Sequence, residues 1–431
     1  MTGSTAPQGF LRDTGWSLLA SVLAGPLVLI AAVVTARWLP TDAHGQLQAM
    51  LSLLALIATV GNGGLVAATI QRMRGADTPP AEAIGAGLLG VTAFGALLVG
   101  AFALGEPWLR ARVLLDAPTG AYLALAALVL PTLWGSILGA TARGLGRFDW
   151  WSRAELSNKG GRLLAFGALA LGWPPSVPLA MAAVLAVQVG VALGLAGRVL
   201  GATGRPRLDA AELGASLRFG SMAWLTTGAH QLHERLDLVL LAVLRGDPTE
   251  VAIYAVAVGV VNRLRVVPLA LASALFPHVA GMPGPEGARF TARVARVAAA
   301  TAIVLGLLVA AVAPWAFPWL FGPDYAASTA PAWLLLPGAV ALTPYLVLSR
   351  WFQAVDRQQV NVLALLLSVA LNLGLNLWWI PTHGLLGAAG ASLISYGLQG
   401  SILAVAFLRT SGLPHTELWL LRASDLRREA A

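Results

Sequence analysis

The sequence predicts an all-α polytopic membrane protein with about twelve transmembrane helices, arranged as two parallel six-helix lobes around a central cavity. Three observations support this fold class. Of the 431 residues, 57% are hydrophobic and 11% are charged, whereas a soluble domain has about 25% charged residues. The apolar runs are long and continuous, which favours helices over a β-barrel. The chain also partly repeats itself, which predicts two related halves.

The apolar runs define the predicted helices in chain order. Most are about 20 residues long, which is the length that crosses the hydrocarbon core of a bilayer. No connection between them is long enough for a separate soluble domain, and the run 157–173 is the shortest. The predicted spans are 16–38, 47–69, 83–104, 121–142, 157–173, 178–200, 217–243, 251–276, 293–318, 330–349, 360–380 and 385–408.

The basic residues predict how the chain is oriented. A net charge of +8 could indicate nucleic-acid binding, but the positive charges are scattered among the connections rather than clustered on one face. When the N-terminus is placed in the cytoplasm, most of the 28 lysines and arginines fall on the inner side. The outer side then holds Arg37, Arg110, Arg112 and Arg245. This positive-inside asymmetry predicts that both termini are cytoplasmic and that the number of spans is even.

An internal repeat predicts the domain organisation. A shift of about 207 positions brings equivalent loops and helix ends onto one another. Two halves of six helices share one orientation and are related by an axis along the membrane normal, with a site between them. The predicted domains are an N-lobe, residues 1–204 with helices 1–6, and a C-lobe, residues 205–431 with helices 7–12 and a short cytoplasmic C-terminal tail. The shift matches Leu11-Arg12 to Leu217-Arg218, Pro40 to Pro248, Trp108 to Trp315, Pro131 to Pro337, Arg143 to Arg350 and Asp149 to Asp356.

Four ionisable side chains lie on one stripe of the seventh predicted helix. His230, His233, Glu234 and Asp237 are spaced i, i+3, i+4 and i+7, which places them on a single helical face. A charge at bilayer depth costs roughly 2.5–3.5 kcal/mol on the insertion scale, so it is tolerated where it faces a cavity or a partner. The stripe therefore indicates a transporter, with these four residues as candidates for coupling to a proton or sodium ion.

Three arginines are candidates for binding an anionic ligand. Arg235 lies beside the stripe, and Arg263 and Arg265 lie within the eighth predicted helix. A guanidinium stays charged and binds phosphate through two parallel N–H donors, so these three could supply fixed positive charge for an anionic ligand. Two alternatives remain open. Asp237 or Glu234 could neutralise Arg263 or Arg265 and hold two helices together, or these arginines could extend toward the headgroups.

Further polar residues recur at helical spacing in the later spans. Single polar residues in membrane helices often bond neighbouring helices, so packing is the alternative to a role in lining the cavity. The candidates for cavity lining are Asn262, Asn372, Asn376, Tyr396 and Gln399.

The sequence lacks the motifs of catalysis. It has no cysteine, so it has neither a thiol nucleophile nor a thiolate metal site. It also has neither the phosphate-binding Gly-x-x-x-x-Gly-Lys run of ATPases nor a His-Glu-x-x-His metal motif. The longest outer loop, 105–120, is short for a membrane enzyme of glycan assembly. We therefore predict no enzymatic activity, no metal site and no cofactor other than a coupling ion.

Several stretches resemble the polysaccharide-biosynthesis flippases of the multidrug/oligosaccharidyl-lipid/polysaccharide (MOP) exporter superfamily. The segment 36–65 is similar to the opening of that family, and 234–280 is similar to its helix seven and eight region. WLFGPDYAAS at 319–328 resembles the family's loop between helices nine and ten. The most specific likeness is NLGLNLWWIPTHGLLGAAGASLISY at 372–396.

The resemblance implies a flippase of the bacterial inner membrane that moves an undecaprenyl-diphosphate-linked oligosaccharide to the outer leaflet. It implies that Arg263 or Arg265 matches the basic residue of helix eight and that Asp237 matches the acid of helix seven. The implied partners are the lipid bilayer, the lipid-linked glycan and other membrane proteins of glycan assembly, and no nucleic acid. A multidrug or other small-molecule antiporter of the same superfamily and a membrane-embedded glycan-assembly enzyme remain as alternatives.

Overall fold

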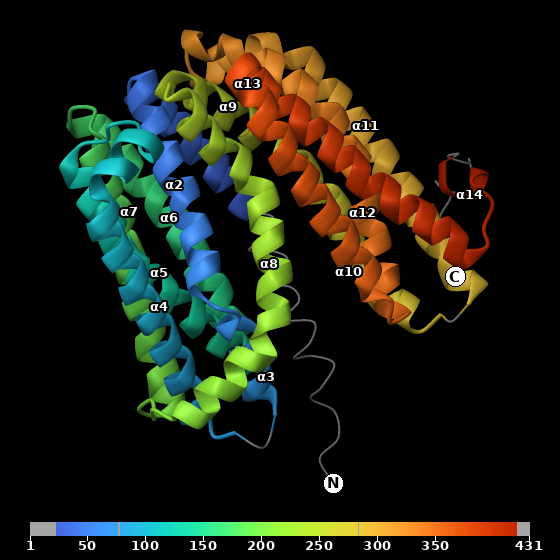
Figure 1. Ribbon diagram of the computed structural model, residues 1–431, viewed down its shortest axis with the longest axis horizontal. Helices are drawn as coiled ribbons and strands as arrows, with labels where there is room; N and C mark the ends of the chain where they lie inside the picture. Colours follow the sequence, from blue (N-terminus) through green and yellow to red (C-terminus); the bar gives the residue numbers. More distant parts are fainter. Residues whose placement is uncertain (1–22, 76–77, 283, 420–431) are drawn as a thin grey trace. The chain divides into compact units, whose positions relative to one another are not determined.

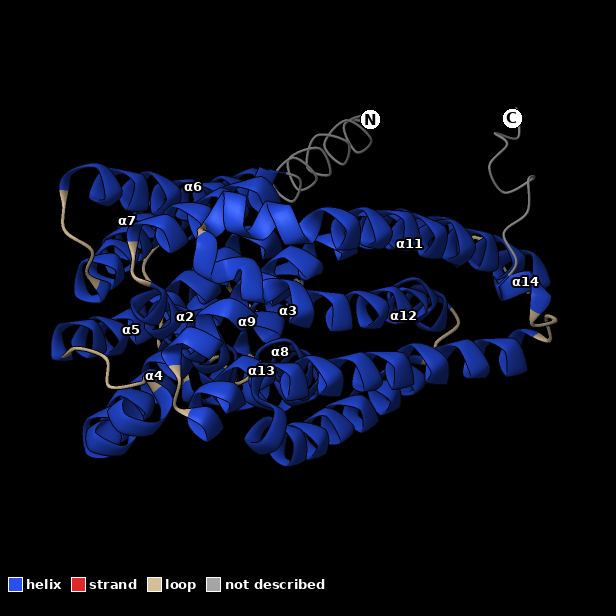
Figure 2. Ribbon diagram, turned by 90° about the horizontal axis from the view of Figure 1, so that it is seen from above, coloured by secondary structure: helices blue, strands red, loops and turns tan. Residues whose placement is uncertain are grey.

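The computed structural model describes residues 23–75, 78–282 and 284–419 (Figure 1). Helices make up nearly all of these residues, and no strand occurs among them (Figure 2). The predicted all-α fold is therefore confirmed. The first seven residues of the predicted span 16–38, the Leu11-Arg12 match and the end of the C-terminal tail lie outside the described residues.

In its described residues, the first part of the chain forms seven helices joined by short connections, and a proline directly precedes or begins α2, α4 and α5. Gly63 and Gly64 have positive φ and separate α2 from α3, because glycine adopts this conformation without strain. A single π-helical turn, Leu109–Val113, follows α4. The elements are Leu23–Trp38, α2 (Thr41–Gly61), α3 (Leu65–Arg74), α4 (Pro80–Trp108), α5 (Thr119–Gly144), α6 (Phe148–Gly172) and α7 (Val177–Thr203).

The second part has the same alternation of long helices and short connections. The predicted span 251–276 is interrupted by a short 3-10 helix, η2 (Asn262–Arg265), which lies between α9 and α10. The other elements are α8 (Ala210–Arg245), α9 (Pro248–Val261), α10 (Val266–Ala280), α11 (Pro285–Phe321), η3 (Pro323–Ser328), α12 (Thr329–Ala354), α13 (Gln358–Ser411) and α14 (Thr416–Trp419).

The membrane spans agree with the sequence prediction. Within the described residues, eight helices are long and apolar enough to cross a membrane. One of them, α13, contains two of the predicted spans, 360–380 and 385–408. A kink at Gly384, which has a non-helical conformation (φ 55°, ψ −134°), separates the two. The helix Leu23–Trp38 and the more polar helices α6 and α8 supply the remaining spans. The layout of about twelve helices therefore holds.

The residues matched by the internal repeat occupy equivalent elements. Pro131 lies inside α5 and Pro337 lies inside α12. Arg143 and Arg350 each lie in the last turns of these helices. Asp149 lies in the first turn of α6, whereas Asp356 lies in the turn that precedes α13. The duplication of the two halves stays a prediction.

The chain divides into two compact units. The first contains residues 1–235 and 246–252, and the second contains residues 236–245 and 253–431. The predicted domains meet at 204/205, whereas the compact units divide inside α8. The reason is that the first part of α8 packs on the N-terminal helices. The boundary of the duplicated halves remains a prediction, since repeats and compact units need not coincide.

Close backbone contacts hold α8 in the first unit. Gly64 and Gly220 approach so closely that a Cβ added at Gly220 would lie 2.4 Å from the Gly64 carbonyl oxygen. The Trp224 indole N–H donates to the carbonyl oxygens of Thr59 and Val60, at 3.1 and 3.2 Å. Two residues without side chains therefore allow a helix crossing that a neighbouring tryptophan then fixes.

The glycine contact makes a stability prediction. We expect Gly220→Ala to destabilise the first unit by about 1–3 kcal/mol, since the new methyl group overlaps backbone atoms that cannot move aside. Gly228→Ala on the same helix is the matched control, because a Cβ there meets nothing within 4 Å. In that open position alanine is expected to stabilise the helix by about 0.5–1 kcal/mol. Melting temperatures of both purified variants test this, and equal shifts would contradict it.

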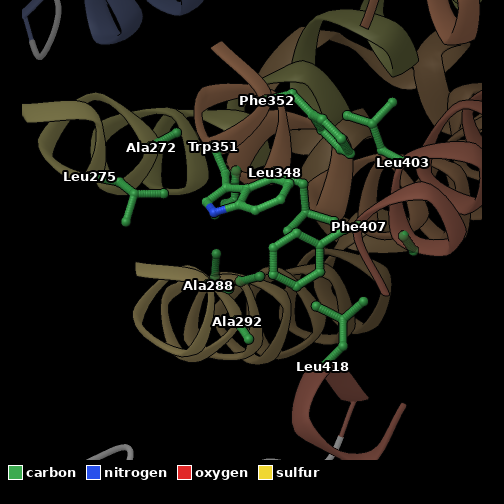
Figure 3. Close-up of a cluster of buried hydrophobic side chains, with 14 of the residues drawn as sticks. Ala272, Leu275, Ala288, Ala292, Leu348, Trp351, Phe352, Leu403, Phe407 and Leu418 are labelled. Atoms are coloured by element: carbon green, nitrogen blue, oxygen red, sulfur yellow. The ribbon is translucent and has the colours of Figure 1, made fainter. Parts of the chain in front are cut away.

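A hydrophobic core closes one end of the second unit (Figure 3). Trp351 contacts Phe352 and Phe407 edge to face, with ring centroids 5.1 and 4.9 Å apart. Leu418 from α14 packs into the same cluster, and the buried Arg296 donates a hydrogen bond to the carbonyl oxygen of Glu417. The short helix α14 is therefore part of this unit rather than a loose tail.

The predicted orientation can be tested directly, because the natural chain has no cysteine. Pro174 lies in the exposed connection before α7, on the predicted outer side, and Arg205 lies in the exposed connection before α8, on the predicted inner side. We expect a membrane-impermeant maleimide to label Pro174→Cys in intact cells, and Arg205→Cys only after the cells are opened. The reverse labelling pattern would invert the predicted topology.

Candidate functional site

Asp237 is buried at the centre of a hydrogen-bonded cluster in the second unit. Its side chain is 3% exposed. Its Oδ2 accepts from the Tyr254 hydroxyl at 2.5 Å and from Ser392 Oγ at 3.1 Å. Its Oδ1 accepts from the backbone N–H of Leu238 at 2.8 Å. Three donors directed at one carboxyl group stabilise a carboxylate anion inside an apolar unit.

Three helices bring this cluster together. Asp237 lies on α8, Tyr254 lies on α9, and Ser392 lies on the part of α13 that follows the Gly384 kink. Only Gly246 and Asp247 separate α8 from α9, so the two helices run antiparallel and Tyr254 returns to the level of Asp237. Ser328 Oγ donates to the carbonyl oxygen of Ile253 at 2.9 Å and helps to fix the start of α9.

Arg265 lies in the same unit, in the 3-10 turn that breaks the eighth span. It is 6% exposed, and its Cζ lies 4.8 Å from the ring centroid of Tyr396. The attraction between a guanidinium and an aromatic face holds the cation in one orientation. Arg263 and Asn262, in the same turn, are half-buried.

The polar residues of α13 bond one another across the kink. Ser368 Oγ donates to the Ser395 carbonyl oxygen at 2.6 Å, and Asn372 Nδ2 donates to Ser395 Oγ at 3.1 Å. Asn376 Nδ2 donates to Asn372 Oδ1 at 2.9 Å. Asn372, Asn376, Tyr396 and Gln399 are all buried. Ser368 and Asn372 thus join the two halves of α13, and Asn376 bonds Asn372 within the first half.

The rest of the predicted stripe belongs to the first unit. His230 Nε2 lies 3.6 Å from Glu234 Oε1, and this pair is partly exposed. His233 is buried, with 3% exposure, whereas Arg235 is exposed. The helical stripe read from the sequence is therefore divided, with His230, His233, Glu234 and Arg235 in one unit and Asp237 in the other.

Tyr254 is the residue of the cluster that sequence reasoning did not select. It forms the shortest contact to Asp237, and it is completely buried. The available signal was its place in Glu-Val-x-x-Tyr, within the segment that carries the family resemblance. Among the described residues, no three His, Asp or Glu side chains gather in a way that could hold a metal ion.

The described residues form a helical, multi-pass membrane protein with a buried polar cluster in its second unit. The family model described as "Polysaccharide biosynthesis protein" matches residues 10–282. The chain therefore belongs to the polysaccharide biosynthesis protein family. A comparison with curated proteins gives no match.

Solved structures show the same fold. The structure of lipid II flippase MurJ in an inward closed conformation superposes with a TM-score of 0.77 at 11% identity, covering 94% of this chain and 88% of that chain. An inward-facing multidrug resistance MATE family transporter of the MOP superfamily gives 0.72 at 14% identity, covering 92% and 98%. A mutant of the Vibrio cholerae MATE transporter VcmN gives 0.60 at 17% identity, covering 94% and 97%. The fold is that of the MOP superfamily, as the sequence resemblance predicted.

Proposed function

We propose that the protein is a flippase that moves an undecaprenyl-diphosphate-linked oligosaccharide from the inner to the outer leaflet of the bacterial cytoplasmic membrane. The observation that carries the proposal is a buried arginine, Arg265, held inside a membrane unit of a chain from a polysaccharide biosynthesis family. A guanidinium stays charged and can bind phosphate oxygens through parallel N–H donors, and a diphosphate is the charged part of this substrate class.

The diphosphate would be bound by Arg265 and Arg263, which both lie in the second unit. Arg235 lies in the first unit, and its contact with the diphosphate stays a sequence prediction. The Cζ of Arg265 lies 4.8 Å from the ring centroid of Tyr396, which is the distance of a cation–π contact. The N–H donors of a guanidinium lie in its plane as a fork that can meet two acceptor oxygens. Such a fork can bind two oxygens of one phosphate at once, whereas a lysine ammonium would bind them less specifically.

Asp237 is the candidate for ion coupling. Its carboxylate accepts hydrogen bonds from a tyrosine hydroxyl and a serine hydroxyl, which belong to two other helices. When a proton or a sodium ion binds this oxygen set, the hydroxyl groups must turn or leave, which changes how three helices are joined. Each charge that moves down a membrane potential of 100 mV releases about 2.3 kcal/mol, and this free energy can drive transport. His230, His233 and Glu234 remain secondary candidates for this role.

A vesicle assay tests the proposal. The purified chain is reconstituted with a fluorescent undecaprenyl-diphosphate oligosaccharide, with the same lipid carrying a monophosphate, and with a cationic dye. We expect the diphosphate lipid to cross the bilayer fastest, because two phosphates offer more acceptors to the arginines. Movement of the dye alone would establish the multidrug antiporter alternative. Formation of a new glycosidic bond, detected by mass spectrometry, would establish the enzyme alternative.

A further inference from the structure

The first unit contains a cavity that the proposed function does not use. Its volume is about 390 Å³, and helices α5, α6 and α7 supply most of its wall. Apolar residues such as Val191 and Leu195 form part of the lining. The polar part of the lining consists of Thr132, Ser136, Arg143, Glu155, Asn158 and Gln188.

Arg143 lines this cavity and has N–H groups that are not used in hydrogen bonds. Its Nε donates to the carbonyl oxygen of Gly139 at 3.3 Å, and its Cζ lies 5.4 Å from the ring centroid of Trp151. Within the described chain, its two terminal nitrogens make no hydrogen bond. The ring thus fixes the guanidinium while the edge that binds oxygen remains available.

A second arginine, Arg162, does not line the cavity but contacts the lining residue Gln188. The terminal nitrogen Nη2 of Arg162 lies 3.5 Å from Gln188 Oε1, and its buried Nε has no hydrogen-bond partner in the described structure. Asn158 Nδ2 donates to the same Gln188 oxygen at 2.6 Å. The hydroxyl of Thr132, which lines the cavity, is also buried and without a partner. The site therefore contains two buried donor groups, Arg162 Nε and the Thr132 hydroxyl, that lack a hydrogen-bond acceptor in the described structure.

Arg143 and Glu155 are the charged residues of the lining, and two further basic residues, Lys159 and Arg162, contact lining residues from outside it. The single lining carboxylate, Glu155, forms an ion pair of 2.6 Å with Lys159. Glu155 also attracts Arg143 and Arg162 electrostatically, but neither arginine has a carboxylate within salt-bridge distance in the described part of the chain. The three basic groups outnumber the one carboxylate, which favours an anion that carries several oxygens.

We propose that this cavity binds a phosphate group, either the headgroup of an anionic phospholipid or a soluble phosphate. The terminal nitrogens of Arg143 would take two phosphate oxygens, Thr132 would donate to a third, and Arg162 would add charge through the wall. The site lies within one unit and is independent of the arginines assigned to the transported diphosphate.

Binding to the purified full chain tests this proposal. The chain is delipidated and supplied with phosphatidylcholine, with phosphatidylglycerol, or with inorganic phosphate, while the melting temperature and native mass spectra report binding. Arg143→Gln and Arg162→Gln remove the two charges, and Arg143→Lys keeps the charge without the planar donors. Arg205→Gln is the matched control, because Arg205 is an exposed arginine of the same unit.

We expect phosphatidylglycerol to raise the melting temperature of the wild-type chain and of Arg205→Gln more than phosphatidylcholine does. Each glutamine variant in the cavity should lower the affinity by about tenfold, and Arg143→Lys should lower it less. Stabilisation by inorganic phosphate would assign the site to a soluble phosphate, and stabilisation by the lipid alone would assign it to a headgroup. Equal effects of both lipids on the wild type together with no response to phosphate would overturn the proposal. So would cavity variants that bind like Arg205→Gln.

Discussion

Replacing Arg265 by glutamine is expected to lower the rate of diphosphate-lipid translocation by about ten- to hundredfold, which corresponds to the loss of one or two charge-assisted hydrogen bonds. Glutamine keeps a planar polar end but removes the charge and the second N–H pair. Initial rates in reconstituted vesicles measure the effect. The wild-type chain serves as the reference at equal protein content.

Two further variants separate binding chemistry from folding. Arg265→Lys keeps the charge but loses the planar fork and its stacking on Tyr396, so its rate should fall between those of the wild type and of Arg265→Gln. Arg289→Gln removes an exposed arginine of the same unit and should leave the rate unchanged. If Arg265→Gln transports as fast as Arg289→Gln, Arg265 does not bind the substrate.

Asp237→Asn is expected to uncouple transport from the ion gradient. The substitution keeps the size of the side chain but removes the charge that accepts hydrogen bonds from Tyr254 and Ser392. Without a group that binds a proton or sodium ion, the substrate can equilibrate across the bilayer but should not accumulate against its gradient. Accumulation at several pH values and sodium concentrations measures the coupling.

The neighbours of Asp237 provide graded controls. Tyr254→Phe removes one donor without changing the ring, and Ser392→Ala removes the other, so each should weaken coupling while leaving the carboxylate in place. Losing one hydrogen bond to a charged group corresponds to about 1.5–3 kcal/mol. An Asp237→Asn protein with the pH and sodium dependence of the wild type would exclude Asp237 as the coupling group, whatever its effect on stability.

The sequence predicted the position of Asp237 but not its environment. On the helical face His230, His233, Glu234 and Asp237 form one stripe, and a helical pattern contains no information about which unit each side chain enters. In the structure, α8 packs on the N-terminal helices near Gly220, and its final turns belong to the second unit. All four residues remain on one continuous helix, and the structure adds the contacts of the Asp237 carboxylate with Tyr254 and Ser392.

The polar residues of α13 show the same distinction. Their spacing indicated two polar faces, in the segments 360–380 and 385–408. Only the kink at Gly384 turns these faces toward each other, so that Ser368 and Asn372 both bond Ser395. A role in packing and a role in lining a cavity have the same sequence pattern, because both require polar side chains on one helical face.

The sequence by itself determined the class of the protein and the order of its helices, because hydrophobicity, helix length and breaker residues are local properties of the chain. Only the tertiary structure decided the partners of the buried charges. Tyr254 and Ser392 are 17 and 155 positions from Asp237, and nothing local specifies those contacts. They depend on how several helices pack, which is set by the shapes of all the side chains between them.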